Sequence, residues 1–433
     1  MELIIDKTII MASSQTQYLS YVFSPQGQSG YLLECKLSLY LSYKNEGIMA
    51  NLGLVLSGGG ARGAYQAGAL AAIGDICKDL KIENPFTIYT GVSAGAINVS
   101  FLAADPKSFL DGTKTLTKLW SQIESDQVFV SDAMSLSRLG LQWMTDLSLG
   151  GMKKATPGKA LLDTSPLGKL ISENCRFENI QKNINAKKFL GVAISAMDYA
   201  NTNNVTFTQA HESLPVWTRV RRHMERTDLS TDHVLASAAI PLLFPPVGIE
   251  NRYFGDGCIR NLSPCGPAIY MGAQKLIAIG VRKKQDLCYS YEHHKTVEPP
   301  SAARVVNVLL NAIMMDGMEV DLERIDRINE NLRKLDEIHR SHLSVKQVEY
   351  VWISPSYDIA EIAATKSNLL PRTIRYMLKG LGNIDEASEI ISYLLFESGY
   401  CKKLIDMGYE DTMKQKVALA KFIVGEKETK KAS

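Results

Sequence analysis

The stretch that decides the fold begins with LGLVLSGGGARG, residues 52–63. Residues 52–56 are an uninterrupted apolar run, which is typical of a buried strand. Residues 64–73 are rich in alanine and predict a helix directly after the glycines. A second apolar run, residues 86–92, leads into GVSAG at 91–95, where another helix of small residues begins. The order strand, glycine turn, helix therefore occurs twice.

The first turn consists of Gly58, Gly59, Gly60, Ala61, Arg62 and Gly63. Glycines let the backbone bend tightly and approach a ligand closely. The helix that follows directs free N–H groups and the positive end of its dipole towards the turn. This arrangement favours binding of a phosphate or of a developing oxyanion.

The same glycine spacing also fits a dinucleotide-binding fingerprint. Its acidic partner would be Glu83, which follows Gly63 by 20 residues (83 − 63). That acid should end the second strand, however, and Glu83 precedes the second apolar run. A P-loop is excluded because Ala64 and Tyr65 stand where that motif needs Lys and Ser or Thr.

The second turn, Gly91-Val-Ser-Ala-Gly95, has the pattern of a nucleophile elbow. In such a turn the serine lies between a strand and a helix with its hydroxyl exposed above the sheet. Gly91 and Gly95 are needed because neighbouring backbone crowds this position. We therefore predict that Ser93 is a nucleophile.

Composition excludes several classes of protein. The chain has 433 residues and a net charge of +2, so no global field favours nucleic acid. Its seven cysteines are scattered without a CxxC pair, which argues against a disulfide framework or a zinc site. We expect no metal and no cofactor, and a reducing compartment.

A serine nucleophile needs a base, and the sequence offers one at Gly255-Asp256-Gly257-Cys258. An aspartate between glycines can present its carboxylate without steric cover, although the same pattern also suits an ordinary turn. A histidine base is the alternative. In the order Ser, Asp, His, the histidines that qualify are His293, His294, His339 and His342.

These motifs together resemble the patatin-like phospholipases. The resemblance covers roughly residues 51–285 and rests on the two glycine turns, on the segment ASAAIPLLFPP at 236–246, and on Asp256-Gly257. It implies a three-layer α/β/α fold with a mostly parallel central sheet, and hydrolysis of lipid acyl esters without a cofactor.

The resemblance also implies roles for residues. Ser93 and Asp256 would form a catalytic dyad, and the turn at 58–63, with Arg62 beside it, would form the oxyanion hole. Cys258 departs from the Asp-Gly-Gly or Asp-Gly-Ala that is usual in the family, which puts the fine geometry of this loop in question.

We expect four regions along the chain. Residues 1–48 would be a poorly ordered extension or lie upstream of a true start at Met49, and residues 49–285 would form the catalytic domain. Residues 286–425 would be a mainly helical region packed on it, followed by a charged tail at 426–433.

The predicted function is hydrolysis of carboxylic esters in phospholipids or lysophospholipids through an acyl-enzyme. The alternatives are acyl transfer by the same dyad and a catalytically silent module that binds lipid or nucleotide.

The sequence shows no signal peptide and no membrane span, which favours a cytoplasmic protein that contacts membranes peripherally and transiently. Apolar residues between Met134 and Leu147 fall near one helical face. They predict either a helix packed on the core or a cap that meets lipid.

Overall fold

The structure is a computed structural model that describes residues 51–130, 160–284, 299, 301–314, 317–381 and 387–425. Four predictions fall outside these residues: the extension at 1–48, the apolar helix face at 134–147, the pair His293 and His294, and the charged tail at 426–433. The chain divides into two units. In the smaller unit, residues 326–347 include the short helix α13 (Glu337–Ser341), which begins at the N-cap Asp336.

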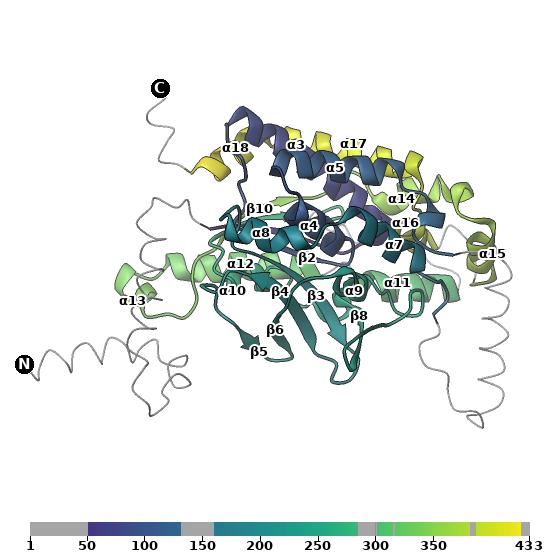
Figure 1. The fold of residues 1–433 in the computed structure, drawn as a ribbon, viewed down its shortest axis with the longest axis horizontal. Coiled ribbons are helices and arrows are strands. Elements are labelled where there is room, and N and C mark those ends of the chain that lie inside the picture. Colours follow the sequence, from purple (N-terminus) through teal and green to yellow (C-terminus); the bar gives the residue numbers. More distant parts are fainter. Residues whose placement is uncertain are drawn as a thin grey trace, which may run out of the picture. The chain divides into compact units, whose positions relative to one another are not determined.

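The larger unit, residues 51–325 and 348–433, is built around one mixed sheet (Figure 1). The strands run in the order β10-β9-β1-β2-β3-β4-β6-β5, and the first five of these are parallel. β8 pairs with β3 and with β7. Their bounds are β1 Leu52–Leu56, β2 Ile88–Val92, β3 Gly191–Asp198, β4 Asn204–Ala210, β5 Thr218–Arg219, β6 Arg222–Arg226, β7 Val247–Ile249, β8 Arg252–Asp256, β9 Lys275–Ile279 and β10 Glu349–Ile353.

Helices cover both faces of the sheet. In β1, Leu54 and Leu56 pack into one apolar core while Val55, between them, packs into a second one on the opposite face. This alternation follows from the two-residue period of a strand. Because both faces are buried there, the central parallel strands β1, β2, β3 and β9 are mostly apolar. The predicted α/β/α fold with a mostly parallel sheet is confirmed.

The helices of the larger unit fall into an N-terminal and a C-terminal set. Together with the short 3-10 helices they are η1 Gly60–Arg62, α3 Gly63–Asp79, α4 Ala94–Ala104, α5 Phe109–Gln122, η2 Ser125–Gln127, α7 Ser165–Asn174, α8 Glu178–Asn185, α9 Thr231–Ser237, η3 Gly257–Arg260, α10 Gly266–Tyr270, α11 Ala302–Met314, α12 from Gly317, α14 Ile359–Ala364, η4 Ser367–Leu369, α15 Arg372–Leu381, α16 Ser388–Leu394, α17 Ser398–Lys414 and α18 Lys416–Val424.

Helix α17, near the C-terminus, lies directly along α3, next to α5 (Figure 1). Glycines permit this close approach. A Cβ on Gly68 would lie 1.9 Å from the Ile405 carbonyl oxygen, and one on Gly408 would lie 2.1 Å from that of Tyr65. The C-terminal helices therefore share a core with the helix that follows the first glycine turn.

Candidate active site

Ser93 lies at the sharp turn between β2 and α4. Its backbone has φ 54° and ψ −122°, a conformation that residues other than glycine rarely adopt. Such strain persists only where the surrounding structure enforces it, and it is frequent at functional sites. A strained serine between a strand and a helix is the geometry of a nucleophile elbow.

Gly91 and Gly95 make this turn possible. A Cβ on Gly91 would lie 2.3 Å from the carbonyl oxygen of Gly95, and a Cβ on Gly95 would lie 2.5 Å from that of Leu56. A larger residue at 91 would displace the start of α4, and one at 95 would push the elbow away from β1. Neighbouring backbone thus crowds both glycines in this structure.

The first glycine turn lies beside this elbow. Gly59 and Gly60 have positive φ values of 151° and 55°, and a Cβ on Gly58 would lie 3.0 Å from the Cβ of Ser93. The N–H groups of Arg62 and Gly63 donate within the turn, to Gly59 O and Gly60 O. The remaining N–H groups of the turn are those of Gly58, Gly59, Gly60 and Ala61, and that of Gly58 faces the Cys258 sulfur.

The side chain of Arg62 contacts a C-terminal helix, α16. It is buried, its Nε donates to Ser392 Oγ at 2.8 Å, and its guanidinium forms an ion pair with Glu389 and stacks over the ring of Tyr393. These partners lie in α16, whereas the sequence analysis placed Arg62 in the oxyanion hole. Arg62 therefore anchors the glycine turn to the C-terminal helices through its side chain.

Asp256 is the last residue of β8 and is fully buried. Its Oδ1 accepts a hydrogen bond from Cys258 N–H at 2.8 Å, while its Oδ2 has no hydrogen-bond partner of good geometry among the described residues. Burial raises the pKa of this carboxyl to about 6, and the hydroxyl of Ser93, which faces it, opposes the rise. A buried carboxylate with a free oxygen and a pKa near neutrality is suited to accept a proton.

The strand register brings Ser93 and Asp256 together. β2 pairs with the first part of β3 and ends with Val92 opposite Ser195. β8 pairs antiparallel with the next residues of β3, so that Asp256 lies opposite Ala196. Ser93 directly follows Val92. The two candidate residues therefore meet beside β3, at the point where its pairing with β2 stops and its pairing with β8 starts.

Cys258 lies between the two turns. A Cβ on Gly58 would be 2.3 Å from its Sγ, and the thiol is nearly buried. Burial, together with the nearby Asp256, raises the pKa of this thiol well above its ordinary value. The residue that departs from the family pattern therefore stays a neutral side chain in contact with the glycine turn. Gly257 is held even more tightly, since a Cβ there would lie 2.1 Å from Ser195 O.

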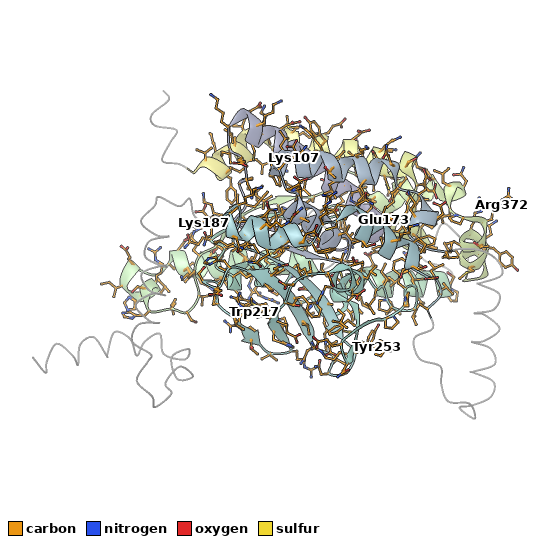
Figure 2. The ribbon with its side chains drawn as sticks, viewed as in Figure 1. Lys107, Glu173, Lys187, Trp217, Tyr253 and Arg372 are labelled. Carbon is orange, nitrogen blue, oxygen red and sulfur yellow. The ribbon has the colours of Figure 1, made fainter. Side chains whose placement is uncertain are left out.

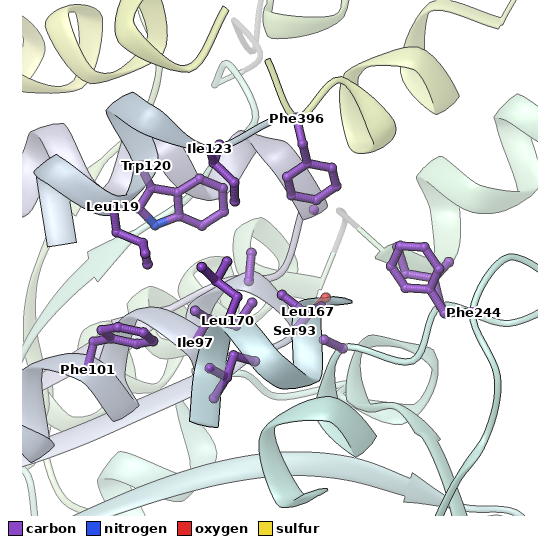
Figure 3. Close-up of a pocket in the computed structure, with 15 residues that line it drawn as sticks. Ser93, Ile97, Phe101, Leu119, Trp120, Ile123, Leu167, Leu170, Phe244 and Phe396 are labelled. Carbon is purple, nitrogen blue, oxygen red and sulfur yellow. The ribbon is translucent and has the colours of Figure 1, made fainter. Parts of the chain in front are cut away.

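An apolar pocket opens beside Ser93 (Figure 3). The space that can hold the centre of a water-sized sphere is about 20 Å³, so the pocket is narrow in this structure. In Figure 3 Ser93 lies near the middle of the lining, with Phe101 and Leu119 to its left and Phe244 to its right. The lining consists of Gly60, Ser93, Ala94, Ile97, Phe101, Leu119, Trp120, Ile123, Leu167, Leu170, Ile171, Ala238, Ile240, Phe244 and Phe396.

Ser237 is a residue of the site to which the sequence analysis gave no role. Its hydroxyl accepts from the N–H of Ser93 at 3.0 Å and donates to the carbonyl oxygen of Ser195 at 2.6 Å. It belongs to the quoted segment 236–246, so the motif was visible although the function of this serine was not.

Asn98 is a second such residue and it fixes α4 against α3 and α5. This fully buried side chain donates to Gly63 O at 3.1 Å and accepts from Trp120 Nε1 at 2.8 Å. A single asparagine in a helix of small residues gave no signal in the sequence.

The described part of the chain offers neither a cluster of metal ligands nor a membrane-spanning helix. Within the described ranges, no three His, Cys, Asp or Glu side chains gather in a way that could hold a metal ion. None of the described helices combines the length and the apolar character needed to cross a bilayer.

The fold is α/β, and its candidate site combines a strained serine, a buried aspartate and an apolar pocket. Residues 54–269 match the model of the Patatin-like phospholipase family, and this part of the chain belongs to that family. No curated protein sequence matches the chain.

Three solved structures are similar to the chain at low identity. VipD from Legionella pneumophila is 14% identical, with a TM-score of 0.32, and the match covers 86% of this chain and 67% of VipD. Human GIVD cytosolic phospholipase A2 is 11% identical, with a TM-score of 0.36, covering 91% of this chain and 62% of that protein. ExoU from Pseudomonas aeruginosa, solved with SpcU, is 13% identical, with a TM-score of 0.26, covering 86% and 76%.

Proposed function

We propose that this protein hydrolyses carboxylic esters of phospholipids or lysophospholipids, with Ser93 as nucleophile and Asp256 as its base. The observation that carries the proposal is the buried Asp256 carboxyl, which faces the hydroxyl of a strained Ser93 and keeps one oxygen free. A binding module would need neither the strain nor the buried carboxyl. Family membership supports the same class of reaction.

The chemistry follows from these positions. Ser93 Oγ attacks the ester carbonyl while its proton passes to the free oxygen of Asp256. The N–H groups of Gly58, Gly59 and Gly60 stabilise the oxyanion that forms. Asp256 then returns the proton to the leaving alkoxide, which gives the free alcohol and an acyl-enzyme on Ser93. Asp256 next takes a proton from water as its oxygen attacks the acyl carbonyl, and then gives this proton to Ser93 Oγ as the fatty acid leaves.

The pocket favours an acyl chain as the part of the substrate that is held. Its lining is almost entirely aliphatic and aromatic, and Ser93 contributes to it directly. Apolar surface buried in this way contributes about 0.8 kcal/mol for each methylene. The head group is then left outside the apolar lining, near a membrane surface that the protein contacts transiently.

The test is lipid analysis after incubation of mixed phospholipid and lysophospholipid vesicles with wild type and with Ser93→Ala. Release of free fatty acid by wild type alone supports the proposal. Lipids that remain intact with both proteins contradict it and favour a silent binding module. Adding a long-chain alcohol separates the other alternative, since a transacylase would form the new ester in place of fatty acid.

A further inference from the structure

Helix α11 exposes its apolar side to solvent. Val305, Val308, Leu309 and Ile313 are 46%, 58%, 56% and 43% exposed. Their spacing of three, one and four residues places them on one face of the helix. A surface helix of a globular protein normally buries such a stripe, so this face is available for a partner.

The opposite side of α11 packs inward and combines Asn307 and Asn311 with the apolar Leu310 and Met314. Asn307 Oδ1 accepts from the N–H of Ile390 at 3.3 Å, and Asn311 Nδ2 donates to Glu389 at 3.2 Å. These bonds to α16 fix the rotation of the helix, with Met314 buried on the same side. The exposure of the apolar stripe is thus enforced by hydrogen bonds and does not result from a loosely placed helix.

Helix α15, which contacts α11, adds positive charge and an aromatic ring. Arg372, Tyr376 and Lys379 follow one another at four and three residues and are exposed, with Tyr376 81% exposed. Figure 2 shows Arg372 on the outer side of α15. Neither α11 nor α15 contains an acidic residue, and Arg304 adds a further positive charge on α11.

This surface is close to the candidate catalytic residues. Helix α11 packs against η3, the turn that directly follows Asp256 and includes Gly257 and Cys258. A partner bound to α11 would therefore lie next to the segment that holds the base.

We propose that the exposed face of α11, with Arg372, Tyr376 and Lys379 of α15, docks the protein on a bilayer that contains anionic lipid. Apolar side chains on one helix enter the acyl boundary, the tyrosine lies at the headgroup level, and the basic side chains bind the headgroups. This inference rests on the proposed function, because it delivers the enzyme to its lipid substrate.

The experiment is vesicle co-sedimentation of the full chain with Ser93→Ala, so that the vesicles stay intact. The probes are phosphatidylcholine vesicles with and without about 30% phosphatidylserine, whose charge attracts basic residues. Val308→Glu with Leu309→Glu should lower the partition coefficient about tenfold or more, since two apolar side chains lose their insertion. Arg372→Glu with Lys379→Glu should remove the preference for anionic vesicles, at about fivefold for each basic residue.

Matched controls are available elsewhere in the structure. Val220→Glu with Val417→Glu introduces the same charges at exposed valines, and Lys114→Glu with Lys118→Glu reverses two exposed lysines of α5. Both controls should bind vesicles like the parent. All substituted side chains are exposed, and circular dichroism should show unchanged folding.

Equal vesicle binding by the α11 variant and the parent would overturn the proposal. So would a change of oligomeric state with unchanged vesicle binding, because the face would then be an interface between copies of this chain. The same substitutions, made in the chain with Ser93 intact, should leave hydrolysis of a short soluble ester unchanged. If wild type hydrolyses no ester but binds vesicles through this face, the proposed function fails while the docking surface stands.

Discussion

The backbone N–H of Ser93 donates a hydrogen bond to the hydroxyl of Ser237 at 3.0 Å, and this hydroxyl donates in turn to the carbonyl oxygen of Ser195 at 2.6 Å. The elbow is thereby tied to α9 and to β3 through one fully buried side chain. Since Ser93 has a strained backbone, this bridge is part of what holds it in place. Ser237 is a positioning residue in this account.

Replacement of the Ser237 hydroxyl should lower both stability and kcat. Ser237→Ala leaves a buried N–H and a buried C=O unpaired, which costs about 1–3 kcal/mol for each unsatisfied group. We expect a lower Tm and a lower kcat for a soluble ester, with KM little changed because the acyl pocket is intact. Ser100→Ala, which removes a buried hydroxyl that has no partner among the described residues, is the control. Equal effects of both substitutions on kcat would contradict the positioning role.

The activity should depend on the ionisation of Asp256. Because burial raises the pKa of this carboxyl to about 6, the base is protonated and inactive at lower pH. We expect kcat/KM to rise with pH through a midpoint near that value. Asp256→Asn should lower turnover by about 10²- to 10⁴-fold at neutral pH. Substitution of His293 and His294 together by Ala should have little effect, and a loss as large as that of Asp256→Asn would restore the histidine alternative.

The same pKa has the opposite consequence for stability. The folded carboxyl binds its proton more tightly than the unfolded one, whose ordinary pKa is 3.8. Ionising it in the native state therefore costs stability, which falls as pH rises from about 4 to about 6 and stays low above that range. Asp256→Asn removes this penalty, on the order of 3 kcal/mol. The variant should melt higher than wild type at pH 8, and this advantage should disappear near pH 4.

Gly58 should tolerate no side chain. A Cβ would lie 2.3 Å from Cys258 Sγ and 3.0 Å from the Cβ of Ser93, so Gly58→Ala should displace the turn and abolish activity. Adding Cys258→Ala removes the nearer clash and should restore part of the activity. Gly399→Ala is the control, because nothing lies within 4 Å of a Cβ there. Full activity of Gly58→Ala alone would exclude this turn from the site.

Local geometry explains why the sequence predicted the two turns. Gly91 and Gly95 are required by contacts within their turn or with the adjacent strand, and Gly59 and Gly60 by their positive φ values, so these glycines leave a pattern in the sequence. The central strands β1 and β9 were equally clear because both faces of the sheet are buried there, which makes them apolar runs.

The remaining features depend on contacts between distant parts of the chain. Arg62 pairs with Glu389, which is 327 residues away, and no local pattern marks such a partner. The antiparallel return of β8 onto β3, which brings Asp256 to Ser93, is a property of the sheet as a whole. In the sequence, the apolar stripe of α11 looks like the buried face of an ordinary helix. Only the rotation of α11 about its own axis, which the structure shows, turns this stripe towards solvent.

The most direct measurement of the central claim is active-site labelling with a fluorophosphonate, followed by peptide mass spectrometry of the wild-type protein. The account predicts one modified residue, Ser93, with loss of ester hydrolysis in proportion to labelling. Labelling should be absent in Ser93→Ala and much slower in Asp256→Asn. Labelling that persists in Ser93→Ala, or ester hydrolysis that survives complete modification of Ser93, would contradict the account.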